Sequence, residues 1–251
     1  MEVYLLLGTV LFISLLVTQF FYMNKLMMNK IVCVYAYYEK NEEYKENLIF
    51  FLENGINDSC DYIFVINGEC TVNIPDKHLI FHRENTGYDY AGYTYASEHT
   101  DLMKYDYLFF MNTSIRGPYS DTKDWQSIFI NLLSEDVKLV GTVVNTNISI
   151  GVHISCQIFL VDNESYKFLK DSDFFSSSTN VTNYHDAIHK KEIVLSTLIG
   201  ASSIGSRSLF GESEIAPVVL GVMSIFVSLL NTLGTYFSWT RRAESHRISF
   251  A

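Results

Sequence analysis

The stretch "IVCVYAYYEKNEEYKENLIFFLENGINDSCDYIFVING", residues 31–68, decides the fold class. It opens with a continuous β-branched and aromatic run, typical of a strand that is buried on both faces. Residues 41–55 then predict an amphipathic helix that Gly55 closes, and residues 61–68 predict a second buried strand. A strand, a helix and a strand in this order indicate an α/β layer.

The same alternation continues along the chain. Further strands are expected over residues 78–84, 105–112, 137–145 and 154–162, and helices over residues 93–103, 121–134 and 163–170. Asp121 is expected to cap the second of these helices, with Asp124 in its first turn. We therefore predict a mostly parallel sheet flanked by helices, which binds ligands beyond the carboxyl ends of its strands.

Two segments at such strand ends carry polar side chains. In "RENTGYDYAGYTYASEH", residues 83–99, Gly87 permits a tight turn, and Asp89 offers a carboxylate among tyrosines that could hold a base or a sugar. The alternative is a loop stabilised by Asp89, with its tyrosines packed on the sheet edge. In "MNTSIRGPYS", residues 111–120, Arg116 could clamp a phosphate, or pair with a surface acid instead.

The motifs of other enzyme classes are absent from the sequence. There is no GxxxxGK[ST], no GxGxxG and no GxSxG, which disfavours an NTPase, a dinucleotide oxidoreductase and an α/β-hydrolase. A net charge of −10 disfavours nucleic acid as a partner. The four cysteines have no CxxC spacing, so zinc is not expected, and Cys33 and Cys156 are interpreted as core thiols.

Five segments in order, from "VYAYYEKNEEYKENLIFFLENG" to "HISCQIFLVDNESYKFL", resemble the glycosyltransferase domains of the rhamnan-synthesis F type. The resemblance covers residues 31–195. The matching motif residues are Asn85, Gly87 and Asp89, then Asn112, Ser114, Gly117 and Pro118, and finally His153 and Gln157.

This resemblance implies a GT-A-like enzyme that moves a sugar from a nucleotide-sugar donor to a glycan or polysaccharide acceptor. It implies three groups of residues: donor-binding Asn85, Gly87, Tyr88, Asn112, Ser114 and Arg116; acceptor-side His153 and Gln157; and the general-base candidates Asp89, His153 and Glu192. The family normally holds Mg²⁺ or Mn²⁺ with a DxD pair. This chain has "NTS" there, so the metal is open and Arg116 is expected to neutralise the diphosphate.

Both ends of the chain predict membrane segments. Residues 3–23 and 215–237 are uncharged runs of 21 and 23 residues, each long enough to span a bilayer. Residues 193–211 are a weaker candidate, for which the alternative is a last globular helix and a loop. The C-terminal part resembles the two-helix SLATT membrane module. The sequence predicts an anchor over 1–30, a GT-A-like domain over 31–192, and a membrane hairpin with a basic tail over 193–251.

The basic residues next to these runs predict the orientation. Lysines at 25, 30, 190 and 191 and arginines at 241, 242 and 247 favour a central domain on the cytoplasmic side of a membrane. The sequons at residues 57, 112, 147, 163 and 180 are then chance occurrences. The alternative function is a non-catalytic membrane protein that binds a nucleotide or sugar. Its homo-oligomer would form through residues 215–237, where Gly221, Ser224, Ser228 and Asn231 have the spacing of a helix interface.

Overall fold

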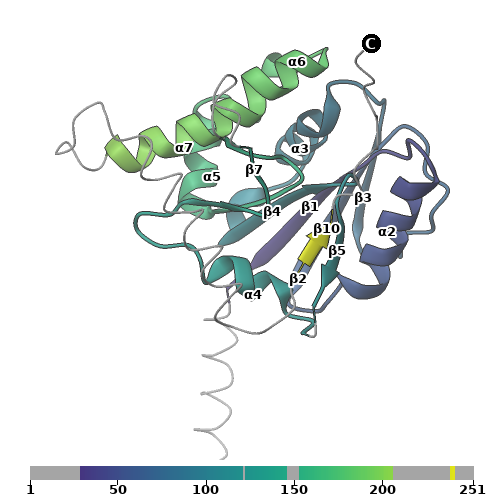
Figure 1. Cartoon of the computed structure of the whole chain (residues 1–251). Coiled ribbons are helices and arrows are strands. Elements are labelled where there is room, and N and C mark those ends of the chain that lie inside the picture. Colours follow the sequence, from purple (N-terminus) through teal and green to yellow (C-terminus); the bar gives the residue numbers. More distant parts are fainter. Residues whose placement is uncertain (1–28, 121, 146–152, 206–237, 241–251) are drawn as a thin grey trace, which may run out of the picture. The chain divides into compact units, whose positions relative to one another are not determined.

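The computed structural model describes residues 29–120, 122–145, 153–205 and 238–240. The chain divides into two compact units, residues 1–30 and residues 31–251, and the second holds the folded domain. The predicted membrane runs at residues 3–23 and 215–237, and the predicted cap Asp121, lie outside the described residues. Figure 1 gives the arrangement of the elements.

A six-stranded mixed sheet forms the centre of the domain. Its order is β3-β2-β1-β4-β9-β6, and the strands are β1 (Ile31–Tyr37), β2 (Cys60–Asn67), β3 (Leu79–Arg83), β4 (Tyr107–Asn112), β6 (Leu139–Gly141) and β9 (Ile158–Asp162). The first four pair in parallel, whereas β9 is antiparallel to both β4 and β6. The predicted mostly parallel sheet is thus confirmed for β1 to β4, and the structure adds an antiparallel edge formed by β9 and β6.

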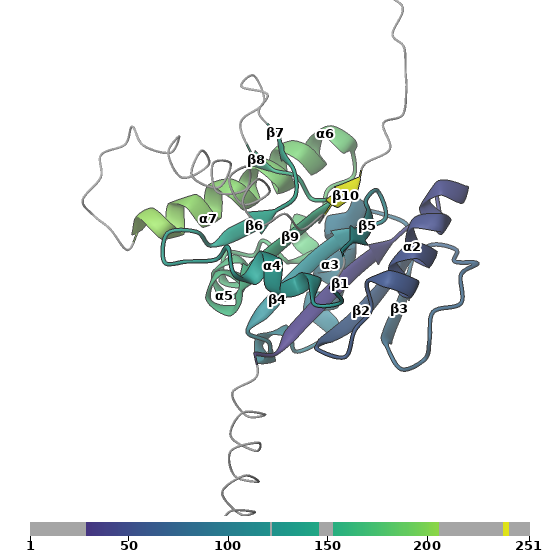
Figure 2. The ribbon, with the colours of Figure 1, turned by 60° about the horizontal axis from the view of Figure 1, so that its bottom comes forward.

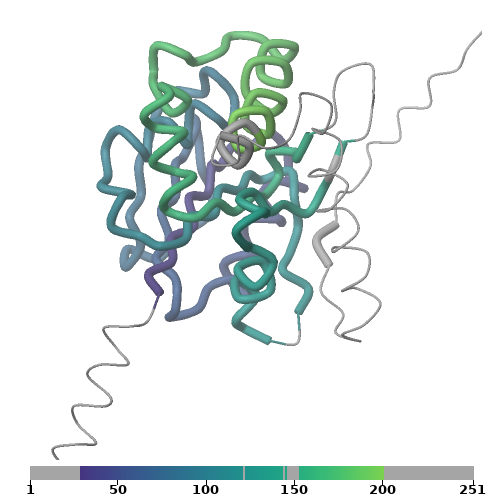
Figure 3. Tube along the Cα trace, turned by 90° about the vertical axis from the view of Figure 1, so that its left-hand side faces the viewer, coloured from purple at the N-terminus to yellow at the C-terminus, as the bar shows by residue number. Residues whose placement is uncertain are grey.

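Helices and short strands connect these six strands. The helices are α2 (Glu42–Asn54), α3 (Tyr88–His99), η1 (Leu102–Lys104), α4 (Trp125–Ile130), α5 (Asn163–Asp171), η2 (Ser177–Thr179), α6 (Tyr184–Ala187), the π-helical turn η3 (Ile188–Glu192) and α7 (Ile193–Gly205). Two small antiparallel pairs join β7 (Val144–Asn145) to β8 (His153–Ile154), and β5 (Arg116–Tyr119) to β10 (Ser238–Thr240). Figure 3 follows the trace from purple β1 to green α7.

The sheet has a separate hydrophobic core on each face, because alternate residues of a strand point to opposite sides. On one face, strand residues such as Val34 and Phe110 pack with α3, α5 and α7. On the other face, Tyr35 and Phe109 pack with α2 and α4, where Trp125 is fully buried. Figure 2 shows α2 and α4 lying over the sheet. The buried strands predicted at residues 31–38 and 61–68 are confirmed as β1 and β2, whereas β3 is a partly exposed edge strand.

Two helix starts differ from the sequence prediction. Helix α3 begins at Tyr88 and not at residue 93, so the Tyr-Gly-Asp segment is the first turns of a helix and not a loop. Helix α4 begins at Trp125, and Asp124 takes the cap position without a side-chain hydrogen bond. Gly55 does end α2, with a right-handed φ of −96°, and an added Cβ there would lie 2.5 Å from the Phe51 ring.

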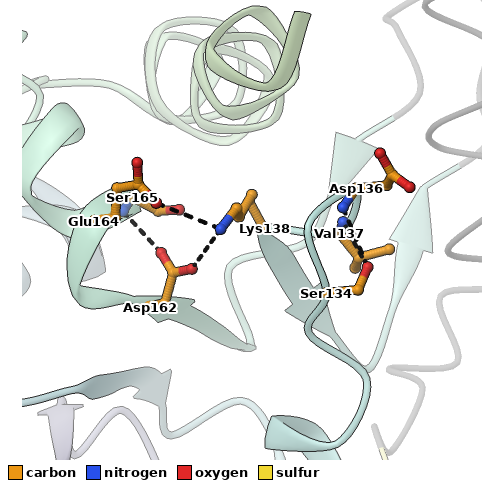
Figure 4. A network of polar contacts seen from close by, with 7 residues as sticks. All are labelled: Ser134, Asp136, Val137, Lys138, Asp162, Glu164 and Ser165. Carbon is orange, nitrogen blue, oxygen red and sulfur yellow. Dashed lines mark hydrogen bonds and ion pairs between the residues drawn. The ribbon is translucent and has the colours of Figure 1, made fainter. Parts of the chain in front are cut away.

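A polar network fastens the antiparallel edge of the sheet to α5. Asp162 accepts a hydrogen bond from the Ser165 N–H at 2.8 Å, which caps α5, and its other oxygen lies 3.1 Å from Lys138 Nζ (Figure 4). Glu164 lies 3.5 Å from the same ammonium group. Because Lys138 immediately precedes β6, these contacts join the edge strand to the neighbouring strand and helix.

Helix α7 packs in the core of the domain. Leu195 and Ile199 are buried in the hydrophobic cluster on its face of the sheet. This packing supports the alternative of a last globular helix for the first part of residues 193–211. In the part of the chain that the structure describes, no helix has both the length and the apolar character needed to cross a membrane.

Candidate functional site at the β1–β4 switch point

The sheet order reverses direction between β1 and β4. From β1 the chain continues through α2 to β2 on one side, whereas β4 lies on the other side. In open α/β sheets the crevice outside the carboxyl ends of two such strands is where ligands bind. Here Thr113 accepts a hydrogen bond from the Tyr38 N–H at 3.2 Å, so the segments that follow β1 and β4 are in contact.

Asp89 reaches this point from the first turn of α3. Gly87 has a φ of 79° and Tyr88 a φ of 59°, so two successive left-handed residues turn the chain from β3 into the helix. The predicted tight turn at Gly87 is confirmed. An added Cβ at Gly87 would also lie 2.6 Å from the Ala91 Cβ, so a larger residue would be crowded as well as strained. The helix dipole favours a carboxylate at the position of Asp89.

Asn112, the last residue of β4, holds Asp89 in place. Its Nδ2 donates to Asp89 Oδ2 at 2.7 Å, while its Oδ1 accepts from the Ser114 N–H at 2.9 Å and from Ser114 Oγ at 2.6 Å. Its backbone N–H donates to the Gln157 carbonyl at 3.1 Å. Because both ends of the amide have partners of the correct kind, its orientation is fixed, with the N–H groups toward the carboxylate.

A second carboxylate approaches from η3. Glu192 Oε1 accepts from the Cys156 thiol at 2.7 Å, and its Oε2 lies 3.2 Å from Nε2 of His153, whose side chain is fully buried. Cys156 also lies 3.9 Å from Asp89 Oδ2. The thiol thus stands between the two carboxylates and connects Asp89 and Asn112 with Glu192 and His153.

The polar cluster changes the ionisation of its members. Burial raises the pKa of Asp89 to about 6, the Glu192 carboxylate adds to this effect, and the hydrogen bond from Asn112 opposes it. Burial, together with the charges of Asp89 and Glu192, raises the pKa of the Cys156 thiol well above its usual range. Near neutral pH the cluster therefore holds an ionised Asp89 that accepts a proton more readily than an exposed aspartate does, beside an un-ionised thiol.

The π-helical turn η3 sets the direction of Glu192. The Ile193 N–H donates to the Ile188 carbonyl, which is an i→i+5 bond. The adjacent Lys191 is buried, and its Nζ donates to the Phe174 carbonyl at 2.7 Å and to Thr179 Oγ1 at 2.9 Å. Burial lowers the pKa of Lys191 to about 8. Lys191 thereby fastens the turn to the segment before α6, while Glu192 faces the cluster.

The remaining predicted donor-binding residues make contacts outside this cluster or lie exposed. Asn85 is exposed, and its Cβ would lie 3.6 Å from a Cβ added at Gly68 beyond β2. Tyr88 is 40% exposed. Arg116 lies 3.4 Å from Glu46 and stacks over the Phe50 ring, with 4.8 Å from the guanidinium to the ring centroid. This is the surface acid pair that the sequence left open as the alternative for Arg116.

Other side chains from the same segments lie in the core. Tyr90 and Tyr93, which the alternative places on the sheet edge, belong to α3 and are buried in the core on one face of the sheet. Gln157, a predicted acceptor-side residue, is 3% exposed, and its Oε1 has no hydrogen-bond partner among the described residues. Its side chain lies within the fold and not at the surface.

The donor set does not fit a dedicated divalent-metal site. Mg²⁺ and Mn²⁺ require converging oxygen ligands. At the end of β4, however, the Asn112 oxygen is engaged by Ser114 and its N–H groups face Asp89. No group of three histidine, cysteine or acidic side chains suited to a metal occurs within the described ranges.

Sequence reasoning missed two members of the site. The sequence predicts a core thiol at Cys156, and the side chain does pack against the core, but the sequence pattern does not reveal its contact with the Glu192 carboxylate. For Lys191 the sequence predicts only a basic residue beside a membrane span, whereas the side chain is buried. The aliphatic spacing of residues 193–199 continues the pattern of a packed helix, and it could have suggested that the preceding lysine is part of the fold.

Comparisons with known proteins place solved glycosyltransferase structures beside this chain. No family profile and no curated protein matches it. Among solved structures it is similar to the mannosyltransferase PcManGT from Pyrobaculum calidifontis, in complex with GDP-Man and Mn²⁺, at 14% identity and a TM-score of 0.40 over 56% of this chain and 47% of that one. It is similar to apo GlyE of Streptococcus pneumoniae TIGR4, at 14% identity and a TM-score of 0.36 over 64% and 42%.

A third similar structure is a glycosyltransferase involved in glycosylation of the major capsid of PBCV-1. Identity is 7% and the TM-score is 0.35, over 64% of this chain and 74% of that one. For the first two structures, in contrast, this chain spans less than half of their length, 47% and 42%. The more specific assignments, to the rhamnan-synthesis F type and to the SLATT module, stay predictions.

Proposed function

We propose that the chain is a GT-A-like glycosyltransferase, which moves a sugar from a nucleotide-sugar donor to a glycan acceptor. The observation that carries the proposal is the Asp89 carboxylate at the β1–β4 switch point, held at 2.7 Å by Asn112 and having a pKa of about 6. A general base works best when its pKa lies near the working pH. A central mixed sheet flanked by helices is consistent with the GT-A-like assignment.

In this proposal Asp89 is the general base. An acceptor hydroxyl oxygen forms a bond to the anomeric carbon of the donor, and its proton passes to the Asp89 carboxylate. The bond between the anomeric carbon and the diphosphate oxygen breaks, and its electron pair leaves with the nucleoside diphosphate. Asp89 Oδ2 accepts from Asn112, and no hydrogen bond to Oδ1 occurs within the described part of the chain, which leaves this oxygen for the acceptor.

The other base candidates have supporting roles in the proposal. The His153 side chain is fully buried against Glu192, so it cannot meet an acceptor hydroxyl without rearrangement. The Glu192 carboxylate contributes to the raised pKa of Asp89. Asn85 and Ser114 remain the proposed donor contacts, and Arg116 would serve the diphosphate only after leaving Glu46.

The test is release of nucleoside diphosphate from a panel of UDP-, GDP-, dTDP- and CMP-sugars by the purified full chain. Each assay is run with Mn²⁺, with Mg²⁺ and with EDTA. We expect Asp89→Asn to lower turnover at least 100-fold without unfolding the protein, because the amide cannot accept the acceptor proton. Asp76→Asn is the matched control, since Asp76 is exposed.

Two outcomes would contradict the proposal. If no nucleotide sugar is turned over or shifts the thermal unfolding midpoint of the folded chain, the site is not a glycosyltransferase site. If a nucleotide sugar binds but is never consumed, and Asp89→Asn changes only its affinity, the non-catalytic binding protein is the better description.

A further inference from the structure

Two tyrosines form an exposed aromatic pair beside the proposed base. In the described part of the chain, Tyr184 is 66% exposed and Tyr88 is 40% exposed, and both are among the few large hydrophobic side chains open to solvent. Their ring centroids lie 6.4 Å apart with 57° between the planes. Tyr88 is the first residue of α3 and Tyr184 is the first residue of α6, so two separate elements bring the rings together.

The backbone holds both rings in defined positions. A Cβ at Gly87 would lie 3.4 Å from the Val181 carbonyl, so the segment before α6 passes directly against the turn that precedes Tyr88. Asn183 caps α6 by accepting from the Asp186 N–H at 2.9 Å. Tyr88 also has a left-handed backbone, with a φ of 59°, which is strained for a residue with a side chain. Such strain is retained mainly where a function needs the geometry.

The pair also lies next to the reacting group. Tyr88 directly precedes Asp89, so their Cα atoms are about 3.8 Å apart. The surroundings of the rings are polar, because Thr86, Asn180, Thr182 and Asn183 are all exposed. An aromatic face with amides and hydroxyls at its border suits a ligand that has an apolar face and a polar edge. A pyranose ring has this character, with C–H groups on its face and hydroxyls around it.

We propose that Tyr88, which the resemblance assigns to the donor, instead joins Tyr184 in binding the acceptor glycan, with the rings stacked on the apolar face of a sugar. The inference rests on the proposed function. It assigns the pair to the acceptor because α6 leads directly into η3, whose Glu192 contacts Cys156, and Cys156 in turn lies 3.9 Å from the proposed base Asp89. The acceptor is thus expected to be an oligosaccharide or polysaccharide, and not a small polar molecule.

The test separates acceptor use from donor use. For the full chain, hydrolysis of the donor without acceptor and transfer to an oligosaccharide are measured side by side. We expect Tyr184→Ala to raise the KM for the oligosaccharide at least tenfold and to leave donor hydrolysis within twofold. Tyr184→Phe should retain wild-type KM, because stacking needs the ring and not its hydroxyl. Leu79→Ala, at another exposed apolar side chain, is the control.

The outcomes distinguish this inference from the proposed function. If Tyr184→Ala raises the KM of the donor instead, the pair stacks on the nucleobase and the inference is wrong; an unchanged KM for both substrates overturns it as well. If the wild-type chain turns over no donor, the proposed function fails, and saturation-transfer NMR with oligosaccharides alone still tests the pair. A saturation-transfer signal from the sugar C–H protons in the wild type, lost in Tyr184→Ala, supports the proposed stacking. Absence of this signal in the wild type contradicts the stacking.

Discussion

Asp89 illustrates how the surroundings of one carboxylate define its chemistry. Its position in the sequence predicted a charged group at the mouth of a site, and the structure adds the hydrogen bond from Asn112 and the neighbouring Glu192. Neither partner could be derived from spacing, because they are 23 and 103 residues away in the chain. The residue type could be predicted from the sequence, but its proton affinity depends on the tertiary packing.

The raised pKa of Asp89 has consequences for activity and for stability. Activity should rise with pH through about 6, as the carboxylate loses its proton, and then remain level to neutral pH. The pKa of Asp89 in the folded protein, about 6, lies above its pKa in the unfolded chain, which is about 4. The free energy of unfolding of the wild type, relative to Asp89→Asn, should therefore fall as pH rises from about 4 to about 6.

Initial rates with saturating donor and denaturant unfolding across this pH range measure the two effects. Asp76→Asn should reproduce the wild-type curves. A pH–rate profile that is flat between pH 5 and 7 would show that Asp89 does not accept the proton.

At the scale of elements, the sequence located the strands more reliably than the helix starts. The continuous apolar run at residues 31–38 predicts a buried strand, and β1 occupies residues 31–37 of it. Helix α3 begins five residues before the predicted start, since Gly92 and several tyrosines are weak helix formers and hide the helical pattern in the sequence. Burial of Tyr90, Tyr93 and Ala96 against the sheet overrides this preference.

Asp162 supplies the clearest element-level prediction. Its side chain caps α5 and pairs with Lys138, so Asp162→Ala should lower the free energy of unfolding by about 1–2 kcal/mol. Glu164→Ala is the matched control, because Glu164 is 85% exposed and meets the same lysine at 3.5 Å, and it should cost less than about 0.5 kcal/mol. Chemical denaturation of the full chain measures both. Equal losses for the two variants would refute the capping role.

At the scale of the whole molecule, the sequence predicts the fold class but does not predict that β9 runs antiparallel to its neighbours. A strand buried on both faces is a continuous apolar run whether its neighbours are parallel or antiparallel, so β9 was not distinguishable from β1. The assembly of the site depends on this reversal. The connection from β8 to β9 carries Cys156 to the carboxyl end of β4, beside Asp89.

The orientation of the domain remains a prediction from the basic residues, and the structure identifies the sequon that tests it best. Asn180 is exposed, whereas Asn112 is 3% exposed within β4 and could not be glycosylated in the folded domain. On synthesis with microsomes we expect no glycan at Asn180, because the domain is predicted to face the cytoplasm. Thr182→Ala removes the sequon. A shift in gel mobility that endoglycosidase reverses, and that Thr182→Ala abolishes, would put the domain in the lumen.

The π-helical turn limits the length of its segment more than the identity of its residues. Consecutive side chains on a helix project about 100° apart, and the extra residue of η3 is what aims Lys191 into the fold and Glu192 at Cys156. A substitution at residues 188–190 would leave that register intact. Deletion of a single codon there would turn Glu192 by about 100° away from the cluster. Insertions and deletions, which surface helices often absorb, would be far more harmful in these five residues than changes of amino acid.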